Sequence, residues 1–227
     1  HNRIHHGFTS LVPLDWIWRP LSPAEYLRRP RWRRVLYRVE RSLPGCGVHY
    51  LVQVWWRAMV RFQPDQGSRG AGYLRGKLVT LAFVAVASAS AYRFAGGAVG
   101  VLGAVLIPFL VFTWVIALVV YLHHTHPDIP FFSSRAEWTR TIAQLHCSTV
   151  IRTTRVTTAL THNILVHVPH HVDARIPFYN LRAAYEDLRP AFGELIHEYP
   201  FRWRTVRGIF RDCKLYDFAN HNWHTFA

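Results

Sequence analysis

Fifteen histidines, several of them in adjacent pairs, are the residues of this 227-residue chain best suited to carry chemistry. Two sets of three have spacings that bring their imidazoles to one face of a helix. The first set is His1, His5 and His6, and the second is His167, His170 and His171. Two such sets facing each other would surround one or two metal ions with nitrogen ligands.

The ligand type narrows the choice of metal. Imidazole suits Zn, Cu, Fe and Ni, whereas Ca and Mg prefer oxygen ligands. Six histidines exceed the four ligands of a tetrahedral zinc site, and no Glu-x-x-His motif of the soluble di-iron type lies beside the two sets. Cys46, Cys147 and Cys213 lie far apart in the sequence, with no Cys-x-x-Cys pair, which argues against a thiolate zinc site and a disulfide framework. The residues predict a multi-metal site with mostly histidine ligands.

A long apolar region separates the two sets, and Arg93 is the only charged residue within its span, residues 78–122. The region is about twice the ~20 residues that one membrane crossing needs. Its two apolar halves flank the sequence RFAGG. We therefore expect a transmembrane hairpin with Arg93 at the far turn, where its head reaches the interface. The alternative, a buried helix pair in a soluble protein, is disfavoured because such helices rarely lack a polar face over this length.

The predicted fold is all-α: an integral membrane protein with a transmembrane hairpin and a cytoplasmic helical cap that carries the histidine site. We divide the chain into a basic and aromatic region with the first set of histidines, the hairpin, and a region with the second set and the cap. These regions are residues 1–77, 78–122 and 123–227. Helices are expected at roughly Trp32–Arg41, Tyr50–Phe62, Arg135–Thr158 and Asn180–Glu198.

Charge gives the expected orientation and partners. The chain has 27 Lys and Arg against 13 Asp and Glu, a formal charge of +14. Basic residues flank both ends of the hairpin, and the positive-inside rule therefore places both polar regions in the cytoplasm. A basic surface attracts either nucleic acid or lipid headgroups. Its position beside a membrane hairpin favours membrane lipids and argues against nucleic acid, and Arg28–Arg41 is the expected interfacial segment.

The motifs and their order resemble the membrane-bound fatty acid desaturases, which have three histidine boxes. HNRIHH is similar to the second box and HVPHH to the third, while YLHHTHP is similar to a QHTHP segment that precedes the third box in ω-6 type members. The stretches WRPLSPAEY and RDCKLYDFANHNW extend the resemblance over essentially the whole chain.

This resemblance implies that the two sets of three histidines bind two irons, with His124 or His126 as a further ligand. Residues two positions apart are separated by about 200° on a helix, so both are not expected to bind from one regular turn. Pro127 ends the helix there, which leaves either possible. His162 and Asn163 are expected to orient ligands without binding the metal. No catalytic residue beyond the metal ligands is implied.

The activity implied by the resemblance is O2-dependent desaturation of long-chain fatty acyl groups in lipid biosynthesis. The partners would be a fatty acyl lipid, O2 and a separate electron donor of ferredoxin or cytochrome b5 type, because the chain has no His-Pro-Gly-Gly haem motif. A related alkane or carotenoid hydroxylase would share the metal chemistry. A membrane metal-binding or transport protein is disfavoured, because the spans offer no polar residues suited to ion passage.

The first histidine box of the family, and the hairpin that precedes it, have no counterpart in the chain. We therefore expect an N-terminally truncated fragment of the desaturase domain, which by itself binds iron poorly and has no turnover.

Overall fold

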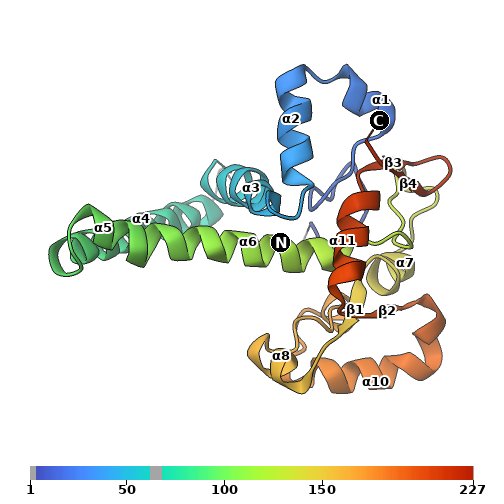
Figure 1. The fold of residues 1–227 in the computed structure, drawn as a ribbon. Coiled ribbons are helices and arrows are strands. Elements are labelled where there is room, and N and C mark those ends of the chain that lie inside the picture. Colours follow the sequence, from blue (N-terminus) through green and yellow to red (C-terminus); the bar gives the residue numbers. More distant parts are fainter. Residues whose placement is uncertain (1–3, 62–67, 227) are drawn as a thin grey trace. The chain divides into compact units, whose positions relative to one another are not determined.

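The computed structural model describes residues 4–61 and 68–226, and the chain divides into two compact units. Unit 1 contains the described chain up to Leu43 and from Val119 onward, and unit 2 is Pro44–Leu118. Helices account for most of the secondary structure of both units (Figure 1). Four short strands, all in unit 1, correct the all-α prediction.

Unit 2 consists of helices only in its described part. They are α3 (Cys46–His49), the π-helix Tyr50–Val60, α4 (Ser68–Phe94), α5 (Ala98–Val101), the short π-helix Leu102–Leu106, and the first part of α6 (Ile107–His124). α4 and α5 are joined by a tight turn in which Gly96 and Gly97 have φ values of +94° and +68°. Glycine reaches this region without a Cβ clash. Arg93 lies exposed in the last turn of α4, as the predicted hairpin requires.

Two helical segments, Gly72–Phe94 and Ala98–His124, are long and apolar enough to cross a membrane, with mean hydropathies of 1.4 and 2.7. Only 6% and 28% of their most apolar windows are buried. Large side chains such as Leu81, Phe83 and Val99 are exposed. The core helices of a soluble protein bury such residues, so this exposure fits the predicted hairpin better than a soluble helix pair.

Unit 1 contains the last turns of α6 and seven further α-helices. These are α1 (Pro23–Arg28), α2 (Arg31–Glu40), α7 (Arg140–Leu145), α8 (Arg155–Leu160), α9 (Val168–Val172), α10 (Leu181–Phe192) and α11 (Trp203–Asp212), with 3-10 turns at Phe178–Asn180 and Gly193–Leu195. A capping box between Ser22 and Glu25 starts α1. α2 begins one residue before the predicted helix and ends one residue earlier.

Two of the four strands overlap helices that were predicted from the sequence: β1 (Thr149–Arg152) lies within Arg135–Thr158, and β2 (His197–Pro200) begins at the end of Asn180–Glu198. β1 pairs in parallel with β2, and β3 (Leu215–Asp217) pairs antiparallel with β4 (Asn222–His224). A continuous helix over Arg135–Thr158 is therefore wrong, because the β-branched residues of β1 favour an extended chain. The helix predicted to reach Glu198 ends at Phe192, where Gly193 follows and the chain then extends into β2.

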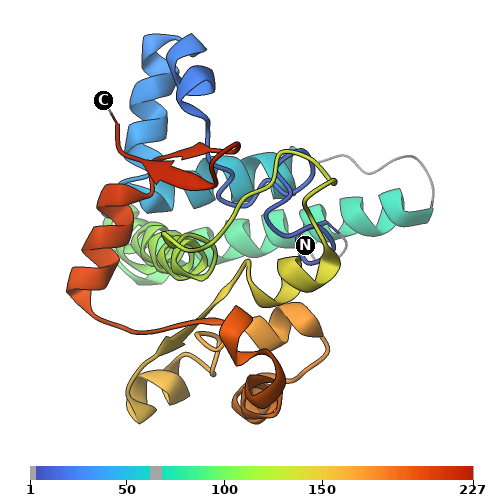
Figure 2. The ribbon, with the colours of Figure 1, turned by 90° about the vertical axis from the view of Figure 1, so that its right-hand side faces the viewer.

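The core of unit 1 joins the N-terminal segment to the C-terminal tail. Leu21, Tyr26 and Tyr37 pack against Leu215 of β3, and a second cluster packs against Tyr216. Arg41 is buried and donates hydrogen bonds to the carbonyls of Trp18 and Cys213. The blue N-terminal segment and the red C-terminal strands meet in both views (Figures 1 and 2). This packing fixes the segment that carries His5 and His6 within unit 1.

Candidate metal centre

Seven of the described histidines form one cluster in unit 1. They are His5, His6, His123, His124, His167, His170 and His171, and neighbouring ring centroids are 3.8 to 6.2 Å apart. The cluster unites the N-terminal turn, the end of α6 and α9 with the residue before it. The structure thus brings together five of the six histidines in the two predicted sets. His1 lies outside the described residues.

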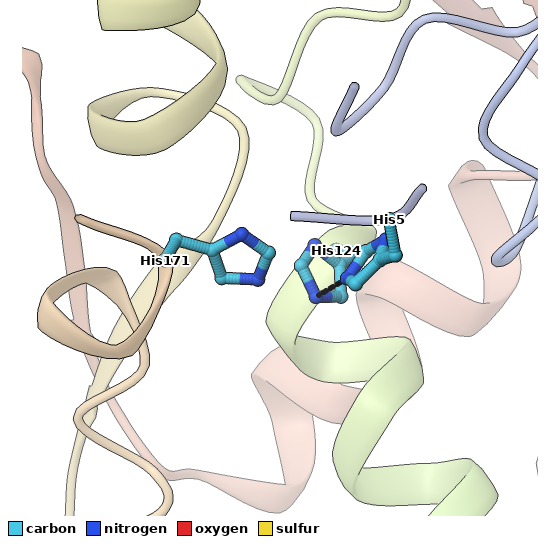
Figure 3. A group of neighbouring side chains, drawn as sticks. All are labelled: His5, His124 and His171. Carbon is cyan, nitrogen blue, oxygen red and sulfur yellow. Dashed lines mark hydrogen bonds between the residues drawn. The ribbon is translucent and has the colours of Figure 1, made fainter. Parts of the chain in front are cut away.

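Four Nε2 atoms meet at the centre of the cluster. His124 Nε2 lies 3.2 Å from His5 Nε2 and 3.2 Å from His167 Nε2, and His171 Nε2 lies 3.1 Å from His167 Nε2. Figure 3 shows His5, His124 and His171 converging from three separate segments. A metal ion about 2.0–2.1 Å from each imidazole places neighbouring ligand nitrogens about 3 to 3.4 Å apart. The observed separations match that spacing.

The opposite nitrogen of His124 fixes the orientation of its ring. His124 Nδ1 lies 3.1 Å from the carbonyl oxygen of Cys147, which only accepts hydrogen bonds. Nδ1 therefore carries the proton, and Nε2 presents a lone pair to the centre. Metal-bound histidines commonly donate their other ring nitrogen to a carbonyl in this way.

Thr9 fixes the orientation of the His171 ring in the same way. Its hydroxyl donates to the carbonyl of His5 at 2.8 Å and lies 3.1 Å from His171 Nδ1. Because its hydrogen is used on the carbonyl, the hydroxyl oxygen accepts from Nδ1, and the lone pair of His171 is on Nε2. One buried threonine thus connects the N-terminal turn to α9.

Asp15 holds the ring of His5. Its two carboxyl oxygens lie 3.0 and 3.1 Å from His5 Nδ1 and accept the backbone N–H groups of Ser10 and Ile17. Burial raises the pKa of Asp15 to about 8, and the hydrogen bonds from Ile17 and Ser10 oppose that rise. A cation at His5 Nε2 favours the form with the proton on Nδ1 and a charged carboxylate.

Burial favours the neutral form of the four imidazoles of His5, His6, His167 and His171. The pKa of His5 is lowered to about 3 and that of His6 to about 4, chiefly by burial, and His170 contributes to both shifts. Burial also lowers the pKa values of His167 and His171 well below the ordinary 6.5. A neutral imidazole is the form that binds a metal ion.

The remaining rings pack around this centre. His6 stacks on His171 at 4.4 Å and meets His170 edge-on at 4.6 Å. His123 stacks on His167 at 3.8 Å. Within the described chain, both ring nitrogens of His123 and Nδ1 of His167 are buried without a hydrogen-bond partner. Unpaired buried nitrogens are costly, and a cation bound at a ring nitrogen of His123 would remove part of that cost. A set of imidazoles alone fits iron, zinc, copper or nickel.

His126 lies elsewhere in unit 1. α6 ends at His124, and His126 beyond it stacks on Tyr199 at 4.9 Å, with its Nδ1 3.3 Å from a carboxylate oxygen of Asp128. Of the two alternatives that the sequence left open, the structure brings His124 to the cluster. His123 also belongs to the cluster, although it was not predicted from the sequence. It lies in the same HHTHP segment as His124, so the histidine pair there could have indicated it.

His162 and Asn163 also lie apart from the ligand contacts. Both have left-handed backbones, with φ of +50° and +56°, and the exposed ring of His162 packs on Phe178 at 4.7 Å. The residues that orient the imidazoles are Thr9, Asp15 and the Cys147 carbonyl instead. Asp15 could have been selected from the sequence, because it is the only acidic residue in the apolar and aromatic run LVPLDWIW.

Fold and site together define a mainly helical protein with two apolar helices of membrane-spanning length and a buried histidine cluster suited to transition metals. Comparison with known proteins makes the class specific. The fatty acid desaturase family model matches residues 1–204. The chain belongs to the fatty acid desaturase family.

Similar proteins include sn-1 oleoyl-lipid 12-desaturases and chloroplastic omega-6 fatty acid desaturases. The chain is 34% identical to the sn-1 oleoyl-lipid 12-desaturase of Picosynechococcus sp. over an alignment covering 100% of the chain and 64% of that protein. It is 31% identical to the protein of the same name from Synechocystis sp., covering 98% and 62%. It is 30% identical to a chloroplastic omega-6 fatty acid desaturase of Glycine max, covering 96% and 50%. The chain thus spans half to two thirds of the length of these relatives.

Proposed function

We propose that the protein acts in O2-dependent desaturation of fatty acyl groups of lipids, at a two-iron centre held by imidazoles. The observation that carries this proposal is the convergence of the Nε2 atoms of His5, His124 and His171, with His167 in contact with two of them. The names of the relatives, which specify acyl-lipid and omega-6 desaturation, support this activity over hydroxylation.

The ligands fall into two groups in this proposal. His5, His124, His167 and His171 would hold one iron through Nε2, and the adjacent His6 and His170 would contribute to the second. His1 stays a predicted ligand, and His123 becomes a further candidate. When bound, the irons supply the reduction of O2 and the oxidation of the acyl chain.

The electron balance requires a reductant. Forming one double bond from two methylenes follows R–CH2–CH2–R′ + O2 + 2 e⁻ + 2 H⁺ → R–CH=CH–R′ + 2 H2O. The acyl chain supplies two of the four electrons that O2 needs, so two more must come from a donor. A separate ferredoxin-type or cytochrome b5-type protein is the proposed source.

The contribution of this chain is to position the ligands and exclude water. Asp15, Thr9 and the Cys147 carbonyl hold three imidazoles with their lone pairs inward, so little reorganisation is needed when metal binds. The cluster is buried, with His5, His124 and His171 each at most 2% exposed. A dry site limits side reactions of reduced oxygen species with water and solvent protons.

We propose that the protein is an integral membrane protein and that its metal site lies on the cytoplasmic side of the membrane. α2 supports contact with a bilayer surface in addition to the two spans. Trp32, Val35 and Val39 are exposed on the face of α2 opposite buried Tyr37. Arginines border this apolar face, and such a helix lies in the interface of anionic membranes.

The experiment is expression of the full-length gene that contains this chain in a host with a simple lipid composition. Mass spectrometry of the extracted lipids maps new double bonds. We expect new unsaturation with the wild-type protein and none with His171→Ala. The matched control, His224→Ala, removes an exposed histidine outside the cluster and should retain activity. A hydroxylated product, or equal activity of both variants, would contradict the proposal.

A further inference from the structure

A cavity of about 460 Å³ lies in unit 1 outside the histidine cluster. It is lined by Thr153, Arg155, Thr158, Ala159, Asn163 and Arg182. α8, the turn that follows it and the first turn of α10 provide these residues, and both views place α8 and α10 at the same end of unit 1 (Figures 1 and 2). The lining contains two cations and no carboxylate.

The two arginines leave positive charge at this cavity. Arg155 forms no ion pair within the described part of the chain, and Arg182 reaches Glu186 only at 4.0 Å. Glu186 is also 3.8 Å from Arg189, so its charge is shared. Guanidinium groups match the geometry of phosphate oxygens. The charge and shape of the cavity therefore favour an anion, with phosphate as the best match.

Asn163 presents a third polar group at the cavity. It follows His162 in a turn where both residues have positive φ, a region that is uncommon outside glycine but in which Asn and His are enriched. The turn is held because Asn163 N–H donates to the Thr158 carbonyl at 3.0 Å. The side-chain amide of Asn163 forms no hydrogen bond among the described residues. Such outliers concentrate at ligand sites, where the amide is kept in place for a partner.

Exposed apolar side chains on the same elements indicate where the anion comes from. Val156 and Leu160, one turn apart on α8, are 69% and 76% exposed, and Phe178 and Tyr179 just before α10 are 49% and 65% exposed. A soluble phosphate compound gives no reason to expose four large apolar groups. Arginines beside exposed apolar residues are typical of a surface that sits at the headgroup level of a bilayer.

We propose that this cavity binds the phosphate of a glycerophospholipid headgroup, with Arg155 and Arg182 on the phosphate oxygens, Asn163 as an additional donor, and the apolar residues in the acyl region. The assignment rests on the proposed function in one respect, because it names glycerophospholipids as the lipid class offered to the metal centre. Binding itself can be measured without turnover, so the two proposals can fail separately.

The experiment uses the full 227-residue chain in neutral maltoside micelles and measures binding of dihexanoyl-phosphatidylglycerol by microscale thermophoresis. Arg155→Gln and Arg182→Gln should each weaken binding about fivefold, corresponding to about 1 kcal/mol per cation near a lipid headgroup. The double variant should weaken it about 25-fold. Both side chains are exposed, so the fold is retained, and circular dichroism verifies this.

The matched control is the double variant Arg204→Gln and Arg207→Gln, which removes the same charge from exposed positions of α11. It should leave binding within about twofold. Asn163→Gly permits the positive φ but removes the amide, and should bind more weakly without loss of stability. The same assay is repeated with inorganic phosphate and with dihexanoylglycerol as ligands. Each should bind at least tenfold more weakly than the phospholipid. Equal binding of inorganic phosphate, or equal weakening by the control double variant, would overturn the proposal.

Discussion

Asp15 gives the sharpest test of how this site is built. Asp15→Asn keeps the shape of the side chain but replaces one acceptor oxygen with an NH2 donor. In the structure the two oxygens accept from the N–H groups of Ser10 and Ile17 and contact His5 Nδ1. An asparagine oxygen cannot serve all three, so a buried N–H loses its partner at a cost of roughly 1–3 kcal/mol. His5 also loses the carboxylate that directs its Nε2 inward, and loss of such a partner lowers metal affinity roughly 10- to 100-fold.

Anaerobic titration of the full-length protein that contains this chain with Co(II), followed by its visible absorption, measures that affinity. Asp128→Asn is the matched control, since Asp128 also contacts a histidine, His126, but its side chain is 66% exposed and its partner lies outside the cluster. We expect a 10- to 100-fold weaker Kd for Asp15→Asn and an unchanged Kd for Asp128→Asn. Equal affinity of Asp15→Asn and wild type, with the fold intact by circular dichroism, would refute the role given to Asp15.

Three other outcomes follow from the same geometry. Thr9→Val removes the hydroxyl that accepts from His171 Nδ1, and the Co(II) titration should show about tenfold weaker binding; an unchanged Kd would argue against the Thr9 bridge. His124→Ala should abolish one equivalent of bound metal whereas His126→Ala should not, and the reverse result would reassign the ligand. Burial lowers the pKa of Lys214 from 10.5 to about 8, so between these pH values only the unfolded state keeps the proton, and stability rises with pH. The melting temperature of wild type should therefore increase relative to Lys214→Met between pH 7 and pH 9.5, and a constant difference would contradict this.

Local patterns in the sequence were enough to predict some elements. The apolar region, in which Arg93 is the only charged residue, and its glycine turn correctly predicted two long apolar helices joined by a tight turn, because two apolar runs around RFAGG allow few other arrangements. The arginine-rich amphipathic pattern located α2 to within one residue at each end. The spacing of His167, His170 and His171 placed them together, although α9 itself is only five residues long.

Other features depend on contacts between residues that are distant in the chain. Thr9 bonds to His171 across 162 positions, and the His124 ring finds its acceptor 23 residues later. No local periodicity reports such pairs. β1 was mistaken for helix because its pairing partner, β2, lies almost fifty residues away. The sequence could not decide between His124 and His126 as the ligand either, because that choice depends on where α6 ends.

The histidine cluster as a two-metal, all-imidazole site is the central claim, and anomalous X-ray diffraction at the iron edge tests it most directly. Crystals of the iron-loaded full-length protein that contains this chain should show two anomalous peaks within the cluster. One peak should lie about 2 Å from the Nε2 atoms of His5, His124 and His171. Iron bound beside His126 instead, or no peak at these Nε2 atoms, would contradict the account.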